Sequence, residues 1–355
     1  MASNGAPSVS LVIVSFNSAA DLRRTLPAVS AELAEGDELI VADNDSEDES
    51  RAVVRELAPQ ARLIELDSNL GFAAGCNAAA EQADGDLLVV LNPDAKPLPG
   101  FGTAIRRPWA DDRGWDAWMA LVASEDATRV NTSGNKLHFT GIAWAGGYGE
   151  PLPQAAQAQP REVAVASGAG LAIPLARWRE LGGFPPQFFA YHEDVDLSFR
   201  IRLTGGRVGI EPSAIIDHDY EFAGRAERWR WMERNRWAFL LRVYTLPLLF
   251  LLAPALLLTE LVLVPASVAA GWGRQKLLAN LDAVRRLPHL LRERRAIQSA
   301  RTVSSAELAT WLTADFDSPF IPGFARSWPA RFLLRGYWRI VRLLLGRPER
   351  GRKPE

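Results

Sequence analysis

Short apolar runs and segments of helical spacing alternate along the first hundred residues. The apolar runs are rich in β-branched residues, have the length of strands, and lie at residues 9–16, 38–42, 63–66 and 87–91. Continuous runs of this kind are typical of strands buried on both faces of a parallel sheet. Apolar positions three or four residues apart predict helices between them, at residues 19–33, 53–57 and 71–82. Strands that begin roughly 25–30 residues apart predict βαβ units, and hence an open, largely parallel α/β sheet with right-handed crossovers.

The middle of the chain is less regular. We expect a hairpin over residues 136–144, a flexible loop at 151–160, and a strand in the apolar segment 163–174. Two glycines in this last segment indicate that its backbone passes close to a ligand or to another strand. The pattern further predicts a helix over residues 194–203 and two short strands within residues 208–216.

The C-terminal third has a different pattern. Residues 243–259 carry no charge, and the apolar run continues past Glu260 to Trp272. A membrane-spanning helix needs about 20 such residues, but three prolines interrupt the run. We interpret it as a kinked hairpin or as interfacial helices that dip into one leaflet, in preference to a full span; a buried pair of core helices is the competing interpretation. Flanking basic and aromatic residues favour the membrane. The basic, amphipathic tail at 331–353 is a second interfacial candidate.

Composition narrows the choice of environment and partner. The 355 residues contain one cysteine, Cys76, which excludes an internal disulfide and a cysteine-based metal cluster; its alanine-rich surroundings predict a buried thiol. No basic region followed by a long apolar core stands at the N-terminus, so we expect the N-terminal part to stay in the cytoplasm. Residues 221–355 carry 23 Lys and Arg against 11 Asp and Glu, whereas the rest of the chain is acidic. The acidic part suits a bound cation, and the basic part suits membrane headgroups or nucleic acid.

Polar residues follow each of the four predicted strands. They are Asn17, then Asp43, Asn44 and Asp45, then Asn69 and Gly71, then Asn92 and Asp94. In open α/β sheets, ligands bind outside the carboxyl ends of the strands. The repetition therefore predicts a ligand site at this edge of the sheet.

Three carboxylates, Glu193, Asp194 and Asp196, fall within four residues between aromatic and aliphatic neighbours. A carboxylate in partly apolar surroundings has a raised proton affinity, which is how a general base is made. A helix start with acidic residues in its first turn is the competing interpretation, because the helix dipole favours them there. Taken alone, the run slightly favours the helix start.

Five motifs together carry a resemblance to a known family. They are Val-Ser-Phe-Asn at 14–17, Val-Ala-Asp-Asn-Asp-Ser at 41–46, Asn-Leu-Gly-Phe-Ala-Ala-Gly-Cys-Asn at 69–77, Leu-Asn-Pro-Asp at 91–94, and the segment 182–200 with Gly-Gly-Phe, Phe-Phe, Glu-Asp-Val-Asp-Leu and Arg200. In this order they resemble the inverting family 2 glycosyltransferases with a GT-A fold, in particular the rhamnosyltransferase-like bacterial branch, over residues 8–240. Each motif is weak alone, but five in order are specific.

The resemblance implies a metal-dependent site for a nucleotide-sugar. Asp94 would hold Mg²⁺ or Mn²⁺, cations that prefer oxygen ligands, and His218 would complete the metal shell. Asn92 occupies the first acidic position of the family's D-x-D motif, so only one carboxylate is supplied. The competing interpretations are a turn-forming Asn-Pro-Asp for residues 92–94 and, at equal weight, an ordinary surface or core histidine for His218.

The remaining assignments follow from the same resemblance. The residues expected at the sugar donor are Ser15, Asn17, Asp43, Asn69, Gly71, Phe72, Asn77 and Asn92. Asp43 would meet the base or ribose, while helix capping is its competing role; close packing of small residues competes at 71–77. On the acceptor side, Asp194 is the expected general base and Glu193 its rival or coupled partner. Asp196 and Arg200 are expected to support this site. Residues 234–236 match a family segment near the diphosphate or the membrane, with a plain basic helix face slightly favoured.

We therefore expect a GT-A catalytic domain over residues 1–228, with a nucleotide-sugar half at 8–100 and an acceptor half at 101–228, followed by a helical, membrane-associated region at 229–355. It would transfer a sugar, with rhamnose the candidate, to a glycan or lipid-linked acceptor at the cytoplasmic face of the membrane. A non-catalytic scaffold on the same fold is the first alternative. An NAD-dependent oxidoreductase and a nucleotidyltransferase are disfavoured because no glycine-rich turn follows the first strand. No nucleic-acid partner is expected, since no recognised module accompanies the basic region.

Overall fold

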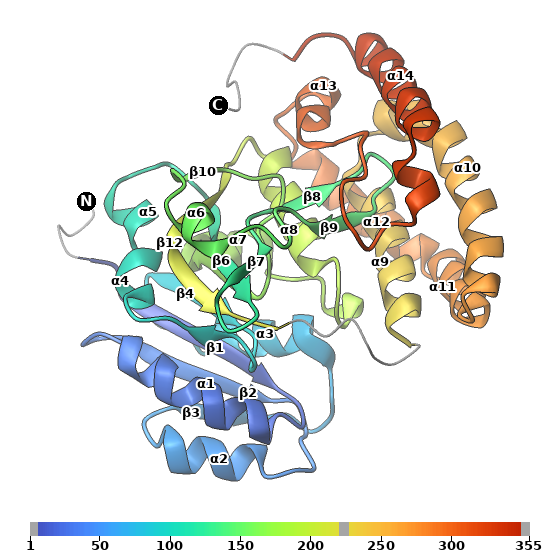
Figure 1. The fold of residues 1–355 in the computed structure, drawn as a ribbon. Helices are drawn as coiled ribbons and strands as arrows, with labels where there is room; N and C mark the ends of the chain where they lie inside the picture. Colours follow the sequence, from blue (N-terminus) through green and yellow to red (C-terminus); the bar gives the residue numbers. More distant parts are fainter. Residues whose placement is uncertain (1–5, 220–226, 349–355) are drawn as a thin grey trace.

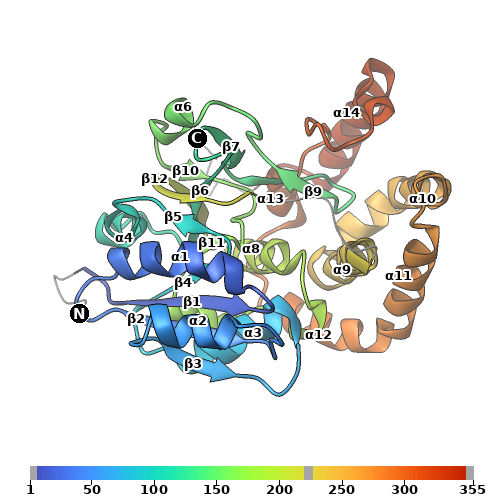
Figure 2. The same ribbon diagram turned by 60° about the horizontal axis from the view of Figure 1, so that its bottom comes forward.

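The computed structural model describes residues 6–219 and 227–348. An α/β part holds the N-terminal two-thirds, and a group of helices from the C-terminal third packs against one side of it in both views (Figures 1 and 2). The elements of the α/β part are β1 (Val9–Ser15), α1 (Ala19–Glu32), β2 (Glu38–Asp43), α2 (Ser50–Leu57), β3 (Arg62–Glu65), α3 (Gly71–Glu81), β4 (Leu87–Leu91), β5 (Lys96–Pro97), α4 (Phe101–Ile105), α5 (Arg107–Ala110), β6 (Ala117–Ser124), β7 (Arg129–Thr132), β8 (Asn135–Leu137), β9 (Ala143–Ala145), α6 (Leu152–Ala156), β10 (Arg161–Glu162), β11 (Gly170–Pro174), α7 (Leu175–Leu181), α8 (Glu193–Leu203) and β12 (Val208–Asp217).

The central sheet has the path β10-β12-β6-β11-β4-β1-β2-β3, with β5 and β7 added at its side. Strands β4, β1, β2 and β3 are parallel, as the βαβ spacing predicts. Strand β11 lies antiparallel between β4 and β6, so the sheet is mixed beyond its first half. Every residue of β1, β4 and β6 is buried, which is why these strands read as continuous apolar runs.

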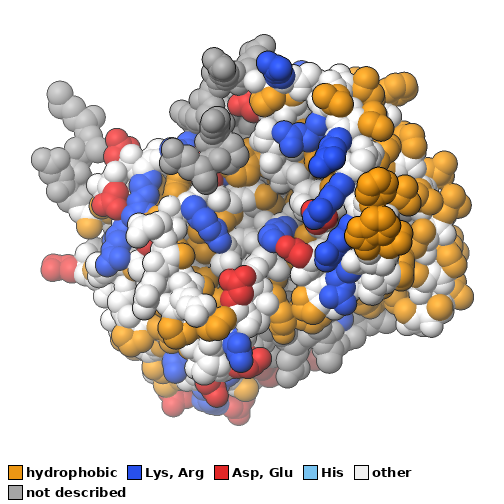
Figure 3. Space-filling view, turned by 45° about the horizontal axis from the view of Figure 1, so that its top comes forward, with side chains coloured by type: hydrophobic (Ala, Val, Ile, Leu, Met, Phe, Trp, Pro, Cys, Tyr) orange, Lys and Arg blue, Asp and Glu red, His pale blue; other side chains and the backbone are white. Residues whose placement is uncertain are grey.

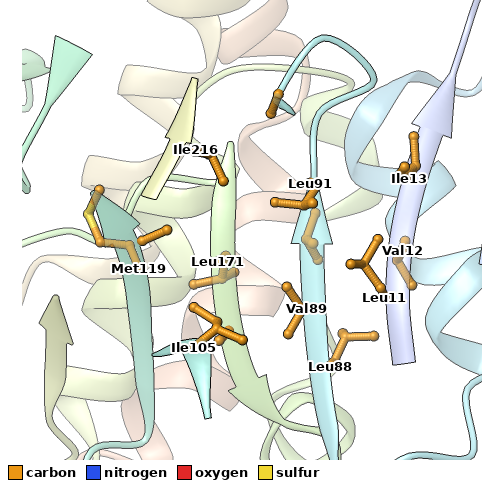
Figure 4. Packing of buried hydrophobic residues seen from close by; sticks show 14 of the residues in the cluster. Leu11, Val12, Ile13, Leu88, Val89, Leu91, Ile105, Met119, Leu171 and Ile216 are labelled. Carbon is orange, nitrogen blue, oxygen red and sulfur yellow. The ribbon is translucent and has the colours of Figure 1, made fainter. Parts of the chain in front are cut away.

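Side chains from neighbouring strands interlock to form the main core. Figure 4 shows Leu11, Val89, Leu171 and Met119 from four strands, with Ile216 of β12 beside them. The four residues from β1, β4, β11 and β6 are each at most 2% exposed. This core fixes the carboxyl ends of the strands, and the residues just beyond those ends are thereby held in place.

The C-terminal helices build a second core with α8. They are α9 (Glu227–Val243), α10 (Leu246–Ala269), α11 (Gly273–Arg285), α12 (Leu287–Ser299), α13 (Ser305–Leu308) and α14 (Trp328–Leu345). Helix α8 serves both cores: Leu197 and Ile201 face the sheet, whereas Val195, Phe199 and Leu203 face the helices. The helix that opens with the acidic run is therefore clamped between the two parts. The predicted domain boundary after residue 228 falls in the first turn of α9.

The structure corrects three expectations about the middle of the chain. The segment 151–160 contains the short helix α6 rather than only a loop. The strand expected over 163–174 is confined to β11, Gly170–Pro174. The two strands expected within 208–216 are one strand, β12, with a bulge between Glu211 and Ile215. Pro212 lies in that bulge, where its missing N–H breaks no ladder hydrogen bond.

Of the two arrangements expected for the apolar run of residues 243–272, the kinked hairpin is wrong, since α10 is a single helix of 24 residues. Pro247 lies in its first turn, where no intrahelical N–H partner is needed. Glu260 faces Arg236 and Lys276 of the neighbouring helices, so its charge is met without a turn. By length and composition, α10 is the one helix among the described residues that could cross a membrane. The tail forms helix α14, and Cys76 is buried as expected.

Candidate active site

A cavity of about 540 Å³ lies where the sheet meets the C-terminal helices. We call it the central cavity. Its lining residues from the sheet side include Asn92, Gly168 and His218, and those from the loop before α8 include Tyr191, Glu193 and Asp194; the helical part contributes Trp229, Met232, Arg236 and Phe320. Asn92, one of the predicted strand-end residues, and the acidic run, which are far apart in the sequence, therefore share one space, whereas Asp94 and the residues that follow the first three strands do not line it.

Glu193 and Asp194 begin α8, so the acidic run is a helix start and also part of the cavity wall. Asp194 accepts hydrogen bonds from the backbone N–H groups of Gly168 at 3.3 Å and Val195 at 2.8 Å. The Asn135 side chain also hydrogen-bonds to it. Burial nevertheless raises the pKa of Asp194 above its ordinary value. Three donors thus orient the Asp194 carboxylate. Its raised pKa makes it a stronger base than an ordinary aspartate, which suits a general base that takes a proton from a hydroxyl.

Glu193 has less support than its neighbour. Its Oε2 atom is buried without a hydrogen-bond partner among the described residues. Burial, with the nearby charge of Asp194, raises the pKa of Glu193 well above its usual range. Two carboxylates this close do not both ionise readily, so they titrate as a pair.

The loop that leads into this pair has an unusual backbone. Phe189, Tyr191 and His192 have φ values of 66°, 71° and 68°, in the left-handed region that costs non-glycine residues about 1–2 kcal/mol each. Asn235 of α9 stabilises this path, because its Nδ2 atom lies 2.9, 2.8 and 2.7 Å from three loop carbonyls. These carbonyls belong to Phe188, Ala190 and Tyr191.

Residues 234–236 are not a plain basic helix face, contrary to the favoured expectation. All three are at least 93% buried. Arg234 donates to the carbonyl of Phe188 at 2.7 Å, next to the bonds made by Asn235. Arg236 binds Glu233 and Glu260. The segment therefore ties the helical part to the loop that precedes Asp194.

Asp94 and His218 are brought together from positions 124 residues apart. Their Oδ1 and Nε2 atoms lie 3.1 Å from each other, and Asn92 Nδ2 lies 3.3 Å from the same ring nitrogen. Burial opposes ionisation of Asp94, but the hydrogen bond and charge of His218 lower the pKa of Asp94 below its ordinary value. No group of three or more His, Cys, Asp or Glu that could hold a metal exists among the residues described. One carboxylate and one imidazole fit a cation that takes its other ligands from phosphate oxygens and water, as Mg²⁺ and Mn²⁺ often do.

The carboxyl ends of β1 and β2 offer two unsatisfied oxygens. Ser15 and Asp43 are register partners on these adjacent strands. Asp43 Oδ1 binds Arg51 Nε at 2.6 Å and accepts from the N–H of Ser46, while its Oδ2 has no partner. The hydroxyl of Ser15 is likewise buried and unpartnered. Asn17, by contrast, accepts from the N–H of Glu47 and so shapes the loop after β1.

The residues expected at the sugar donor from α3 divide into two groups. Phe72 lines the central cavity. Asn69 accepts from the N–H of Gly71 at 3.0 Å, and Asn77 exchanges two hydrogen bonds with the backbone of Phe184. Gly71 has a φ of 84°, and a Cβ there would lie 2.5 Å from the ring of Phe189. Packing against the strained loop thus accounts for Gly71.

Asp196 and Arg200 do not line the central cavity. Asp196 is fully buried and binds Arg200 Nε at 2.6 Å and Arg242 Nη1 at 2.8 Å. The Arg200 guanidinium also donates to the carbonyls of Leu181 and Gly183. This network joins α8 to α9 and to the turn after α7, which gives both residues a supporting position.

Comparison with known proteins agrees with this arrangement. Residues 10–158 match the model of glycosyl transferase family 2. The chain contains a family 2 glycosyltransferase domain. An N-acetylglucosaminyl-diphospho-decaprenol L-rhamnosyltransferase of Mycobacterium tuberculosis is 25% identical over 242 residues, which cover 61% of this chain and 77% of that protein. A succinoglycan biosynthesis protein, ExoO of Rhizobium meliloti, is 33% identical over 135 residues, 38% of this chain and 37% of its own length.

A solved structure with a similar fold confirms the GT-A fold class. GalNAc-T7, in a crystal structure with UDP, GalNAc and Mn²⁺, superposes with a TM-score of 0.56 at 16% identity. The match covers 69% of this chain and 49% of that protein. At this identity the likeness concerns the fold alone. The predictions of family and fold class are thus both confirmed, and the roles of single residues stay predictions.

Sequence reasoning missed several residues of the candidate site. Asn135, which binds Asp194, lies at the start of the predicted hairpin, but nothing in the sequence links it to the acidic run. Trp144, at the end of the predicted hairpin, and Tyr148 and Phe320 also line the cavity, and no sequence motif marked them. For Asn235 a signal was present, because it lies inside a recognised family segment, yet its partners are loop carbonyls that no side-chain motif reveals.

Proposed function

We propose that the protein transfers a sugar, with rhamnose the candidate, from a nucleotide-diphosphate donor to a hydroxyl of a glycan or lipid-linked acceptor, with inversion, in the synthesis of cell-envelope polysaccharide. One observation carries the proposal: a base with a raised pKa, Asp194, shares a cavity with His218, the partner of Asp94. The substrate classes are supported by the mycobacterial relative, a rhamnosyltransferase named for a decaprenol-linked acceptor, and by the rhizobial relative, a succinoglycan biosynthesis protein.

Inversion needs one base and no enzyme nucleophile. Asp194 accepts the proton of the acceptor hydroxyl while that oxygen attacks the anomeric carbon, and the nucleoside diphosphate leaves from the opposite face. Gly168 N–H and Asn135 hold the carboxylate in place during this step. A divalent cation, held by Asp94 and His218 when bound, would neutralise charge on the departing diphosphate. Asp43 and Ser15 would meet the nucleoside through their unpartnered oxygens.

We further propose the division of labour expected from the sequence. Residues 8–100 would hold the nucleotide-sugar, residues 101–228 would receive the acceptor, and residues 229–355 would keep the enzyme at the cytoplasmic face of the membrane. Helix α10 and the lipid-linked acceptor named for the mycobacterial relative support this location.

Binding and turnover are tested separately. We expect one of dTDP, UDP and GDP to raise the melting temperature of the purified protein, and Mn²⁺ to increase that shift. Asp94→Ala would lose the metal-dependent part of the shift, whereas Asp84→Ala, at an exposed position, would keep it. No shift with any of the three nucleotides contradicts the proposal. Binding of nucleotide without hydrolysis or transfer by any preparation points instead to the non-catalytic scaffold.

A further inference from the structure

Helix α10 exposes a broad side that carries no charge. Its exposed large side chains are Leu246, Phe250, Leu257, Leu258, Leu261, Val262, Val264 and Val268, and Phe250 is 81% exposed. The only charged residue of the helix, Glu260, points away from this side toward α9 and α11. A contiguous surface of this kind on a folded protein marks a site of interaction.

Helix α14 continues this surface and adds a border of positive charge. Its exposed apolar residues are Trp328, Phe332, Leu333, Ile340, Leu343 and Leu344. Its four arginines, Arg331, Arg335, Arg339 and Arg342, recur at helical spacing along one stripe, and the helix contains no Asp or Glu. Arg335 is paired with Asp315, which precedes the helix. Figure 3 shows apolar side chains gathered where Figure 1 places α10 and α14, with a row of Lys and Arg along their border. We call the exposed apolar residues of the two helices the apolar face.

Polar and apolar contacts attach α10 to the rest of the protein along its first half and near its middle. Glu260 binds Arg236 of α9 and Lys276 of α11, and Lys276 is 99% buried. The Tyr337 hydroxyl of α14 donates to the carbonyl of Leu251. Leu248, Leu252 and Leu256 pack into the second core. A helix attached in this way keeps one long side against protein, so it cannot cross a bilayer without breaking these contacts.

We propose that the apolar face inserts into one leaflet of an anionic bilayer, with α10 and α14 lying in the membrane plane and the arginine stripe of α14 at the headgroups. The proposal rests on the membrane location put forward above and is independent of the transfer chemistry. Charge decides between the possible occupants of the face. A second copy bound through this face in a two-fold dimer would bring two arginine stripes toward each other, whereas anionic headgroups complement them.

The proposed position of α10 and α14 in the membrane also relates to the central cavity. Phe320 and Ile321 line that cavity, and the chain runs from them through the exposed Phe324 into α14. This part of the cavity wall is therefore connected by a few residues of chain to the apolar face. An acceptor whose lipid tail stays in the leaflet could reach Asp194 along this side.

Vesicle binding tests the arginine stripe. We expect the full chain to co-sediment at least tenfold more strongly with vesicles of phosphatidylcholine and phosphatidylglycerol than with phosphatidylcholine alone. Arg339→Glu with Arg342→Glu would remove most of this preference, because each basic residue near the surface contributes a several-fold attraction. Arg107→Glu with Arg129→Glu makes the same change of charge on exposed residues of the α/β part and would leave binding unchanged. Equal binding of both double variants contradicts the proposal, as does a stable dimer that fails to bind vesicles.

The in-plane orientation has its own test. Helix α10 is about 36 Å long at about 1.5 Å per residue, so a spanning helix would place its ends on opposite sides of the membrane. Single cysteines at Leu246 or Val268 can be labelled with NBD because Cys76 is buried. External dithionite should reduce the label at both ends on protein added to sealed vesicles, as it does for a control label at exposed Asp84. Protection of one end until the vesicles are lysed would overturn the in-plane arrangement. Neither vesicle co-sedimentation nor dithionite access depends on catalysis, so a protein without transferase activity can still give the expected result in both tests.

Discussion

Asp194 and Glu193 are neighbours in the sequence but differ in their surroundings. Asp194 is held by backbone and side-chain donors, whereas one oxygen of Glu193 has no partner. We therefore expect Asp194→Asn to lower kcat by about 10²–10⁴-fold, because the amide cannot take a proton in the transition state. Binding of nucleotide, measured by thermal shift, should be unchanged. A turnover near that of the wild type would show that another group is the base.

The same pair sets the pH dependence of the reaction. The base must be ionised, and burial raises the pKa of Asp194, so activity should fall with decreasing pH at a higher pH than an ordinary Asp would give. Burial raises the pKa of Glu193 well above its usual range, so Glu193 is still protonated while Asp194 ionises. Glu193→Gln keeps this position neutral, and we expect it to leave the acidic limb of the kcat/KM profile in place. A limb that moves to lower pH in this variant would show that a charged Glu193 takes part in the titration.

The loop of residues 188–192 shows that the site depends on contacts between elements. Asn235→Ala removes the donor that faces three loop carbonyls, so we expect kcat to fall by about 10–100-fold through misplacement of Asp194, with KM for the sugar donor little changed. Gln298→Ala is a matched control, because Gln298 also donates to two backbone carbonyls but at the far end of α9. Equal losses of kcat in both variants would indicate a general loss of stability rather than a positioning role.

Contact of α3 with the same loop can be tested at Gly71. Gly71→Ala combines a left-handed φ with a Cβ placed 2.5 Å from Phe189, and we expect a loss of about 2–5 kcal/mol in the free energy of unfolding. Gly36→Ala has a similar φ of 88° and nothing within 4 Å, so it should cost only about 1–2 kcal/mol. Urea unfolding of the two variants separates backbone strain from the clash. Equal losses would show that the loop moves aside.

The strands and helices of this protein differ in how far the sequence predicts them. The buried strands and the helices between them could be predicted, because burial on both faces and helical spacing leave direct patterns. The pairing of Asp94 with His218 depended on family motifs, since no local rule joins residues so far apart. The single helix α10 could not be predicted, because what makes Glu260 compatible with it lies on α9 and α11. For the same reason the role of Asn235 was hidden: its partners are backbone atoms of a distant loop.

At the scale of the whole molecule, a buried charge network joins the helices of the C-terminal part. Glu233 and Glu260 bind Arg236 and Lys276 between α9, α10 and α11. Burial opposes the ionisation of Glu233, but the charges of Arg236 and Lys276 outweigh it and lower the pKa of Glu233 to about 2. A carboxylate with a lowered pKa in the folded state stabilises the fold at pH values above 4.5, the pKa of the group in the unfolded chain. This contribution is lost as the pH falls toward about 2.

We therefore expect the free energy of unfolding to decrease as the pH falls from about 5 to 3. Glu233→Gln should cost about 3–5 kcal/mol at pH 7, because it leaves two buried cations, Arg236 and Lys276, to share the single carboxylate of Glu260. It should also flatten the dependence of stability on pH. Glu56→Gln, at a mostly exposed position, should follow the wild type. Urea unfolding between pH 3 and 7 gives both quantities. The raised pKa values of Glu193 and Asp194 have the opposite effect on stability. Burying these two carboxylates in the charged form destabilises the fold, and this cost disappears as they become protonated at lower pH. Parallel curves for Glu233→Gln and the wild type would therefore show that groups other than this network govern acid stability.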